Sequence, residues 1–366
     1  MTGATAGRDP AGRLAVEGRD PGRDERAAGR EAASLLEVEG LTTVLHLPGG
    51  AARVVRNVSF EVASGETLGI VGESGCGKTM LALSLIGMAP HPPAGVVAGA
   101  ARFRGDDLLA LPVRALREVR GRDIGMIFQE PMTALNPLMT VGEQIAEVAR
   151  RHLDLSPRAA RGHSIEMLER VRVPDPDRRA RSYPHELSGG MRQRAMIAAA
   201  LVCDPAILIA DEPTTALDVT IQSQILSLIA DLQERLGMGV ILITHDLGVI
   251  AETADRVMVM YAGRKVEEAP VAELFADPRH PYTRGLVESV PIVGRGRDLP
   301  LAEIAGTVPE AGEEPAGCAF ASRCGRVEER CRREAPRFAE RRGGPGSRGR
   351  RGWRGTACHN PWGGTA

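Results

Sequence analysis

The segment that most constrains the fold of this chain is residues 72–79, which read GESGCGKT and fit the pattern G-x-x-x-x-G-K-[ST] in full. Residues 66–71 before it (ETLGIV) predict a buried strand, and residues 78–88 after it predict a helix. Glycines let the backbone wrap a phosphate, and the N–H groups of the turn and of the helix start attract the anion. We therefore expect a nucleotide's phosphates to contact Gly72, Glu73, Ser74, Gly75, Cys76, Gly77, Lys78 and Thr79.

Three side chains of this segment have distinct expected roles. Lys78 is one of two lysines among 46 basic residues, the other being Lys265. Its compact ammonium reaches the β- and γ-phosphates in a way that an arginine fork does not reproduce. Thr79 supplies a hydroxyl to Mg²⁺. Cys76 is interpreted as a small residue that fits the loop, and a reactive thiol is the alternative.

A second motif is a strand that ends in two acids. Residues 207–210 are apolar and predict a buried strand, and Asp211 and Glu212 follow it. Ligands of open α/β sheets bind at the carboxyl ends of the strands. We expect Asp211 to hold Mg²⁺, usually through water, and Glu212 to orient or deprotonate an attacking water. Without the phosphate-binding loop, a solvated strand end would be the ordinary interpretation.

A third motif opens the strongest predicted helix, residues 191–202. Ser188, Gly189 and Gly190 precede that helix, and Ser-Gly-Gly at a helix start favours anion binding. Since the loop at 72–79 already provides one phosphate cradle, the second one is explained if it serves the nucleotide of another subunit. An ordinary serine N-cap is the alternative.

The alternation of strands and helices predicts an α/β fold with a mostly parallel sheet covered on both faces. We expect residues 1–33 to be a disordered tail, residues 34–292 to be the nucleotide-binding domain, and about 130–190 to be a helical insertion within it. A Gly/Arg/Pro-rich linker near 291–300 precedes residues 293–366, a small extension with four cysteines.

Composition excludes several classes of protein. The net charge of −1, from 46 basic and 47 acidic residues, and an aromatic content of 3% argue against a general nucleic-acid binder. An apolar content of 43% excludes a wholly disordered chain. The longest apolar stretch, 80–89, is far shorter than the roughly 20 residues of a spanning helix. No apolar N-terminal signal is present, so we expect a cytoplasmic chain whose membrane role is peripheral.

The order of these motifs resembles that of ABC-transporter ATPase subunits. Residues 216–218 (ALD) and 244–246 (THD) continue the same order. Longer stretches look like the dipeptide/oligopeptide (peptide/nickel) importers. They are FQEPMTALNP at 128–137, YPHE at 183–186, DEPTTALDVT at 211–220, THDLGVI at 244–250 and HPYT at 280–283. The resemblance covers about residues 35–360.

This resemblance implies a P-loop NTPase of ABC type. Its expected parts are a mostly parallel core sheet, an antiparallel β subdomain, a helical subdomain and a small C-terminal extension with cysteines. The implied function is that of an ATP-hydrolysing motor of a di- or oligopeptide importer at the cytoplasmic face of the membrane. The implied partners are a second ABC ATPase subunit (identical or a sister chain), two transmembrane permease subunits and, indirectly, an extracytoplasmic solute-binding protein. No nucleic acid is expected.

The resemblance also implies roles for individual residues. Ser188 and Gly190 would contact the γ-phosphate of the partner's ATP. Gln129 would contact Mg²⁺ and the water, and it would couple the site to the membrane subunits. His245 would contact the γ-phosphate, and Asp218 would bridge the two sites. One departure is the stretch 44–47 (VLHL), which lacks the aromatic that usually stacks on adenine, so that His46 or an aliphatic contact would replace it.

The extension carries the spacing C-x5-C-x6-C-x26-C. A cytoplasmic chain disfavours disulfides, and the gaps are too long for the usual zinc hairpin. Four thiolates also suit a [4Fe–4S] cluster, which some similar importer ATPases carry in this segment. A cluster is the favoured interpretation, with zinc or unliganded thiols as alternatives, on Cys318, Cys324, Cys331 and Cys358.

Four other functions compete with peptide import. An ABC-type ATPase of DNA repair would carry a long coiled coil between the two phosphate motifs, where this chain has about 110 residues. An ABC-type ATPase of translation would carry two ATPase domains in one chain. A redox sensor with a vestigial ATPase is disfavoured by the intact Lys78, Asp211, Glu212 and His245. Import of nickel chelates or other small solutes also remains open.

Overall fold

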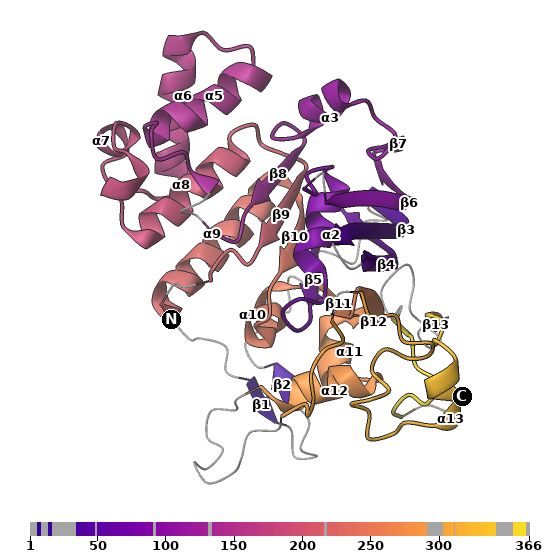
Figure 1. Ribbon diagram of the computed structural model, residues 1–366. Helices are drawn as coiled ribbons and strands as arrows, with labels where there is room; N and C mark the ends of the chain where they lie inside the picture. Colours follow the sequence, from indigo (N-terminus) through magenta and orange to yellow (C-terminus); the bar gives the residue numbers. More distant parts are fainter. Residues whose placement is uncertain are drawn as a thin grey trace.

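The computed structural model describes residues 34–47, 50–90, 93–130, 134–215, 218–290, 303–310, 312–341 and 354–363, and the strands 6–8 and 14–16. Two sheets form the body of this region (Figure 1). The larger has the strand order β13-β14-β12-β11-β5-β10-β9-β8, and the smaller has the order β4-β3-β6-β7. The predicted α/β class, with a parallel core and a separate antiparallel sheet, is confirmed.

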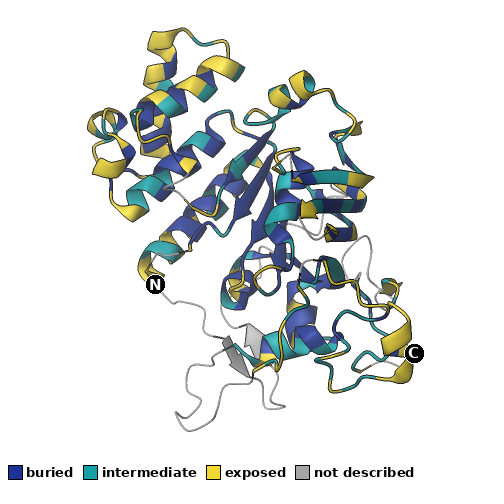
Figure 2. Ribbon diagram, in the orientation of Figure 1, coloured by how far each residue is buried: buried dark blue, intermediate teal, exposed yellow. Residues whose placement is uncertain are grey.

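The centre of the large sheet is parallel. Strands β8 (Ile124–Ile127), β9 (Ile207–Asp211), β10 (Gly239–Ile243), β5 (Thr67–Val71) and β11 (Arg256–Tyr261) pair in that spatial order. Every residue of β5, β9, β10 and β11 is buried, because both faces are covered (Figure 2). The strands that precede residues 72–79 and Glu212 therefore flank β10 and end at the same edge of the sheet.

The antiparallel sheet contains β3 (Ser34–Leu47), β4 (Gly50–Ala63), β6 (Ala94–Phe103) and β7 (Asp106–Asp107). Its buried residues share one core with those of helix α2 (Lys78–Leu85) and of the parallel strands. The buried hydroxyls of Thr43 on β3 and Ser84 on α2 lie 2.8 Å apart. Helix α2 is shorter than the predicted 78–88, since Gly87 takes a φ of +59° that ends the helical geometry.

A helical layer follows α3 (Val113–Val119) and β8 in the chain. It consists of α5 (Val141–His152), α6 (Pro157–Arg170), α7 (Pro176–Ala180), the 3₁₀ turn Pro184–Glu186 and α8 (Gly189–Leu201). These helices lie at the upper left of Figure 1, and the long helix α9 (Val219–Leu236) comes later in the chain, between β9 and β10. A helical insertion was predicted for about 130–190, and α5 to α7 lie in that range.

The last part of the chain returns to the edge of the large sheet. It contains α10 (Leu247–Thr253), β12 (Arg264–Pro270), α11 (Val271–Ala276), α12 (Pro281–Glu288) and α13 (Glu329–Arg333). Strand β14 (Arg354–Thr356) pairs antiparallel with β12, and β13 (Ala339–Arg341) pairs with β14. The cysteine-bearing extension thus continues the core sheet rather than standing apart from it.

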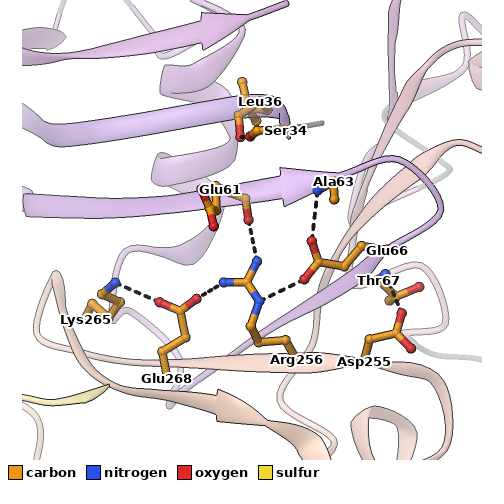
Figure 3. Close-up of polar contacts among 10 residues, drawn as sticks. All are labelled: Ser34, Leu36, Glu61, Ala63, Glu66, Thr67, Asp255, Arg256, Lys265 and Glu268. Carbon is orange, nitrogen blue, oxygen red and sulfur yellow. Dashed lines mark hydrogen bonds and ion pairs between the residues drawn. The ribbon is translucent and has the colours of Figure 1, made fainter. Parts of the chain in front are cut away.

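A buried ionic network fastens the two sheets to each other (Figure 3). Arg256 on β11 donates to the carboxylates of Glu66 (2.8 Å) and Glu268 and to the carbonyl of Glu61 on β4 (2.6 Å). Lys265 on β12 donates to Glu268 (2.7 Å) and to the carbonyl of Ser59 on β4 (2.6 Å). Burial opposes the charge of Arg256, but the carboxylates of Glu268 and Glu66 outweigh it and raise the pKa of the guanidinium.

Two predicted segments lie largely outside the described residues. Of the expected tail 1–33, the structure describes β1 (Ala6–Arg8) and β2 (Leu14–Val16), which pair antiparallel. The expected linker at 291–300 also falls outside.

Candidate active site

The loop between β5 and α2 has the backbone that a phosphate cradle requires. Gly72, Gly75 and Gly77 take φ values of +155°, +78° and +97°. A Cβ on Gly72 would lie 2.3 Å from the carbonyl oxygen of Met260, and one on Gly77 would lie 2.3 Å from that of Val54. Glycine is therefore needed at both positions for space as well as for backbone geometry.

Lys78 begins α2 and folds back over the loop. Its Nζ donates to the carbonyl oxygens of Gly72 (2.7 Å) and Glu73 (3.0 Å), and the residue is 6% exposed. Cys76 is buried beside it, and burial raises the pKa of its thiol despite the neighbouring Lys78. The thiol is thus neutral at pH 7, which agrees with a packing role for Cys76.

Asp211 ends β9 in the interior, 1% exposed. Burial raises the pKa of its carboxyl, while the Thr79 hydroxyl and Lys78 act to lower it. Its Oδ1 is buried and has no hydrogen-bond partner among the described residues. A buried carboxylate oxygen with no donor, beside a threonine hydroxyl, suits a hard cation such as Mg²⁺.

The three predicted catalytic residues meet at one carboxylate. Gln129, from the loop after β8, donates its Nε2 to Glu212 Oε2 at 3.1 Å. His245, after β10, places Nδ1 at 3.2 Å from Glu212 Oε1. Thr215 donates its hydroxyl to Oε2 at 2.8 Å. The sequence did not single out Thr215, although its position three residues after Glu212 is that of a local turn contact.

Glu212 itself is held in an unusual backbone conformation, with φ +47° and its N–H donating to the carbonyl of Ile243 at 2.8 Å. Burial acts to raise the pKa of its carboxyl. The hydrogen bonds from Thr215 and His245 and the charges of His245 and Lys78 outweigh burial, so the pKa lies below its ordinary value. Glu212 is therefore a fixed, ionised acceptor at neutral pH.

The other half of the predicted site lies at two helix starts. Ser188 caps α8 by accepting from the Met191 N–H at 3.4 Å, and a Cβ on Gly189 would meet open space. Asp218 caps α9 by accepting from the Ile221 N–H at 2.9 Å. Both side chains are exposed. The structure thus gives these residues local capping roles and leaves the N-terminal face of α8 accessible.

The four cysteines of the extension line one small pocket, together with His280, Phe320 and Arg326. All four are free thiols. Burial raises the pKa of Cys318, Cys324 and Cys358, the last to about 12. Within the part of the chain that the structure describes, no three Cys, His, Asp or Glu side chains are close enough to hold a metal ion. The four predicted ligands therefore line one pocket, but the described residues contain no group of three that could hold a single metal ion.

Two contacts of the phosphate loop were not predicted. The Tyr282 hydroxyl accepts from the Glu73 N–H at 2.8 Å, and Arg323 forms an ion pair with the Glu73 carboxylate at 2.9 Å. These residues lie 209 and 250 positions away in the chain. Tyr282 belongs to the HPYT stretch and Arg323 lies between Cys318 and Cys331, so the sequence pointed to both segments but not to these contacts.

Comparison with known proteins decides the family. Residues 55–215 match the family described as ABC transporter, and residues 266–331 match the one described as oligopeptide/dipeptide transporter, C-terminal region. The "Probable peptide ABC transporter ATP-binding protein y4tR" of Sinorhizobium fredii is 55% identical over 306 residues, which is 84% of this chain and 91% of that protein. The chain belongs to the ATP-binding subunits of the oligopeptide/dipeptide ABC transporters. It is accordingly an ATPase.

Two further similarities agree with this family. The "Dipeptide transport ATP-binding protein DppD" of Bacillus subtilis is 51% identical over 290 residues, 79% of this chain and 86% of that protein. A solved structure of the ATP-binding cassette MJ0796, dimeric and bound to ADP and Pi, is 28% identical with a TM-score of 0.58. The match covers 64% of this chain and 98% of the chain in that structure. In the described part of this ATPase, none of the helices has the length and apolar character needed to cross a bilayer.

Proposed function

We propose that this ATPase is the motor subunit of an importer of dipeptides or oligopeptides. The proposal is supported by relatives that are named for peptide transport and match most of the chain, and by the C-terminal match at residues 266–331. Its partners are a second ABC ATPase subunit, two permease subunits and, indirectly, an extracytoplasmic binding protein. The subunit acts at the cytoplasmic face of the membrane as a peripheral protein.

The loop 72–79 binds the phosphates of ATP in this proposal. Lys78 exchanges its two carbonyl partners for the β- and γ-phosphates, which it reaches from the start of α2. The residues present fit Mg²⁺, which Thr79, Asp211 and Gln129 would hold, directly or through water. When bound, that cation offsets the charge on the phosphate oxygens.

Glu212 performs the proton step. Its ionised carboxylate orients a water and accepts a proton from it as the water oxygen bonds to the γ-phosphorus. The bond from that phosphorus to the β–γ bridging oxygen breaks, and ADP and phosphate are the products. Gln129 and His245 hold the carboxylate from opposite oxygens, so they position the base and the water around it.

The exposed start of α8 completes the site of a partner. Ser188, Gly189 and Gly190 present N–H groups and a hydroxyl to the γ-phosphate held by the other subunit, and Asp218 lies between the two sites. The 28% identical cassette is dimeric in its structure bound to ADP and Pi, which supports the presence of a second subunit.

We also propose that a [4Fe–4S] cluster is bound by Cys318, Cys324, Cys331 and Cys358. Zinc is the alternative metal for the same thiols. The support is the single pocket that all four thiols line. Anaerobically purified protein should be brown and contain about four iron atoms per chain, and Cys358→Ser should lower that number. The control is Cys203→Ser, outside the pocket. Colourless protein with stoichiometric zinc would contradict the cluster.

The observation that carries the catalytic proposal is the convergence of Gln129, His245 and Thr215 on Glu212. Glu212→Gln should keep ATP binding and lower turnover by about 10²- to 10⁴-fold, the usual contribution of a general base. The same variant should abolish uptake of labelled di- and oligopeptides by cells that depend on this subunit. Glu37→Gln, an exposed glutamate on β3, is the matched control. Normal ATP turnover in Glu212→Gln would remove Glu212 from the mechanism, and normal peptide uptake would assign another cargo.

A further inference from the structure

Arg323 of the C-terminal extension reaches the phosphate-binding loop. Its Nη1 donates to both carboxylate oxygens of Glu73, at 3.1 and 2.9 Å. The Arg323 side chain is 4% exposed and that of Glu73 is 29% exposed. Ion pairs between exposed side chains contribute little, but a charge-assisted pair shielded from water is considerably stronger.

The guanidinium is fixed from every side. Nε donates to the carbonyl of Ala305 at 2.9 Å and Nη2 to that of Ile304 at 2.8 Å, both within the extension. Phe320, three residues before Arg323, packs edge-on against Tyr261 at the end of β11, with ring centroids 5.3 Å apart. All three guanidinium nitrogens thus have partners, so Arg323 holds Glu73 from a rigid base.

Glu73 is also held through its main chain. The Tyr282 hydroxyl accepts its N–H at 2.8 Å, and Tyr282 is fully buried against Tyr261 (ring centroids 4.7 Å) and Phe320 (5.4 Å). The carbonyl of the same residue accepts from Lys78 Nζ at 3.0 Å. A continuous set of contacts therefore leads from Arg323 through Glu73 to the lysine that binds the phosphates.

We propose that Arg323 is a positioning residue, which sets the conformation of the phosphate-binding loop through Glu73 and thereby the affinity for ATP. The C-terminal extension is then part of the nucleotide site, and a change in its packing alters ATP binding without any direct contact with the nucleotide. This inference rests on the proposed role of residues 72–79.

A double-mutant cycle on the full-length chain tests the inference. The variants are Arg323→Ala, Glu73→Ala and the double variant, and the probe is a non-hydrolysable ATP analogue. Each single variant should raise the Kd about tenfold, a typical coupling between residues in contact, and the double variant should raise it no further. In ATP hydrolysis, KM should rise by the same factor while kcat is retained. Arg323→Lys, which keeps the charge, should recover part of the affinity.

Arg333→Ala is the matched control, because Arg333 lies in the same extension but pairs with the exposed Glu329 at 2.7 Å instead of with the loop. A Kd for Arg323→Ala equal to that of Arg333→Ala would overturn the inference. Independent, multiplicative effects of Arg323→Ala and Glu73→Ala would also overturn it. If Arg323→Ala does not fold, the Kd values of Glu73→Ala and Arg323→Lys are compared with that of the control variant instead. A separate variant distinguishes a failure of the proposed nucleotide site. If residues 72–79 do not bind the phosphates, Lys78→Ala will leave the Kd for the ATP analogue unchanged.

Discussion

The two parts of the predicted ATP site differ in how much one chain provides. Around Glu212, the side chains of Gln129, Thr215 and His245 are already engaged, and Asp211 and Lys78 are buried beside the loop. At the start of α8, by contrast, Ser188 only caps its own helix and Gly189 faces open space. The predicted catalytic half is organised within the chain, whereas the second half presents an accessible helix end. This difference is what a site shared between two subunits requires.

The largest expected effect concerns the organised half. Lys78→Ala should weaken ATP binding by about a hundredfold or more, because a charge-assisted contact with phosphate is lost. The measurement is the Kd of the free chain by titration calorimetry, with the melting temperature as a check, since Lys78 also bonds two loop carbonyls. Lys265→Ala controls for the loss of a lysine outside the loop. An unchanged Kd in Lys78→Ala would show that the loop does not bind the phosphates.

A smaller effect should appear in the pH dependence. Glu212 acts as a carboxylate, and its pKa is lowered partly by the Thr215 hydroxyl, so the acid limb of kcat should lie below the ordinary range of a glutamate. Thr215→Val removes that donor at nearly constant volume and should move the limb to higher pH by about half a unit to one unit, the equivalent of one hydrogen bond. The measurement is kcat from about pH 3 to 8, with rapid mixing below about pH 4.5, so that the window includes the acid limb. A limb that stays in place or moves to lower pH would contradict the assignment of Glu212.

The smallest effect concerns the helix start. Ser188→Ala should lower the stability of the free chain by about 1 kcal/mol, the usual contribution of an N-cap, and leave its ATP affinity unchanged. Chemical denaturation measures the first quantity and analogue titration the second. Ser156→Ala, at the start of α6, removes a comparable cap away from both parts of the site. A large loss of ATP affinity in Ser188→Ala would place this helix start in the chain's own site.

The sequence predicted the elements of the candidate site that local patterns determine. The strand and loop around Lys78 and the strand that ends at Asp211 were located because apolar runs and glycines determine the fold there. The residues that it missed make contacts between segments far apart in the sequence. Arg323 and Tyr282 contact Glu73, and Arg256 joins β11 to β4. No local pattern predicts such contacts. Strands β13 and β14 have three residues each, too few to show a periodicity.

The most direct test of the shared site is to block the accessible helix end. In Gly189→Asp, the backbone φ is ordinary and a Cβ meets open space, so the fold is retained while a negative charge faces the partner's phosphate. Gly162→Asp on α6, also in open space, is the matched control. We predict that the free chain binds ATP with unchanged affinity. The ATP turnover of the assembled transporter should fall by at least about half, because one or both of the shared sites lose their anion-binding helix start. Turnover equal to that of Gly162→Asp, or loss of ATP binding by the free chain, would contradict the account.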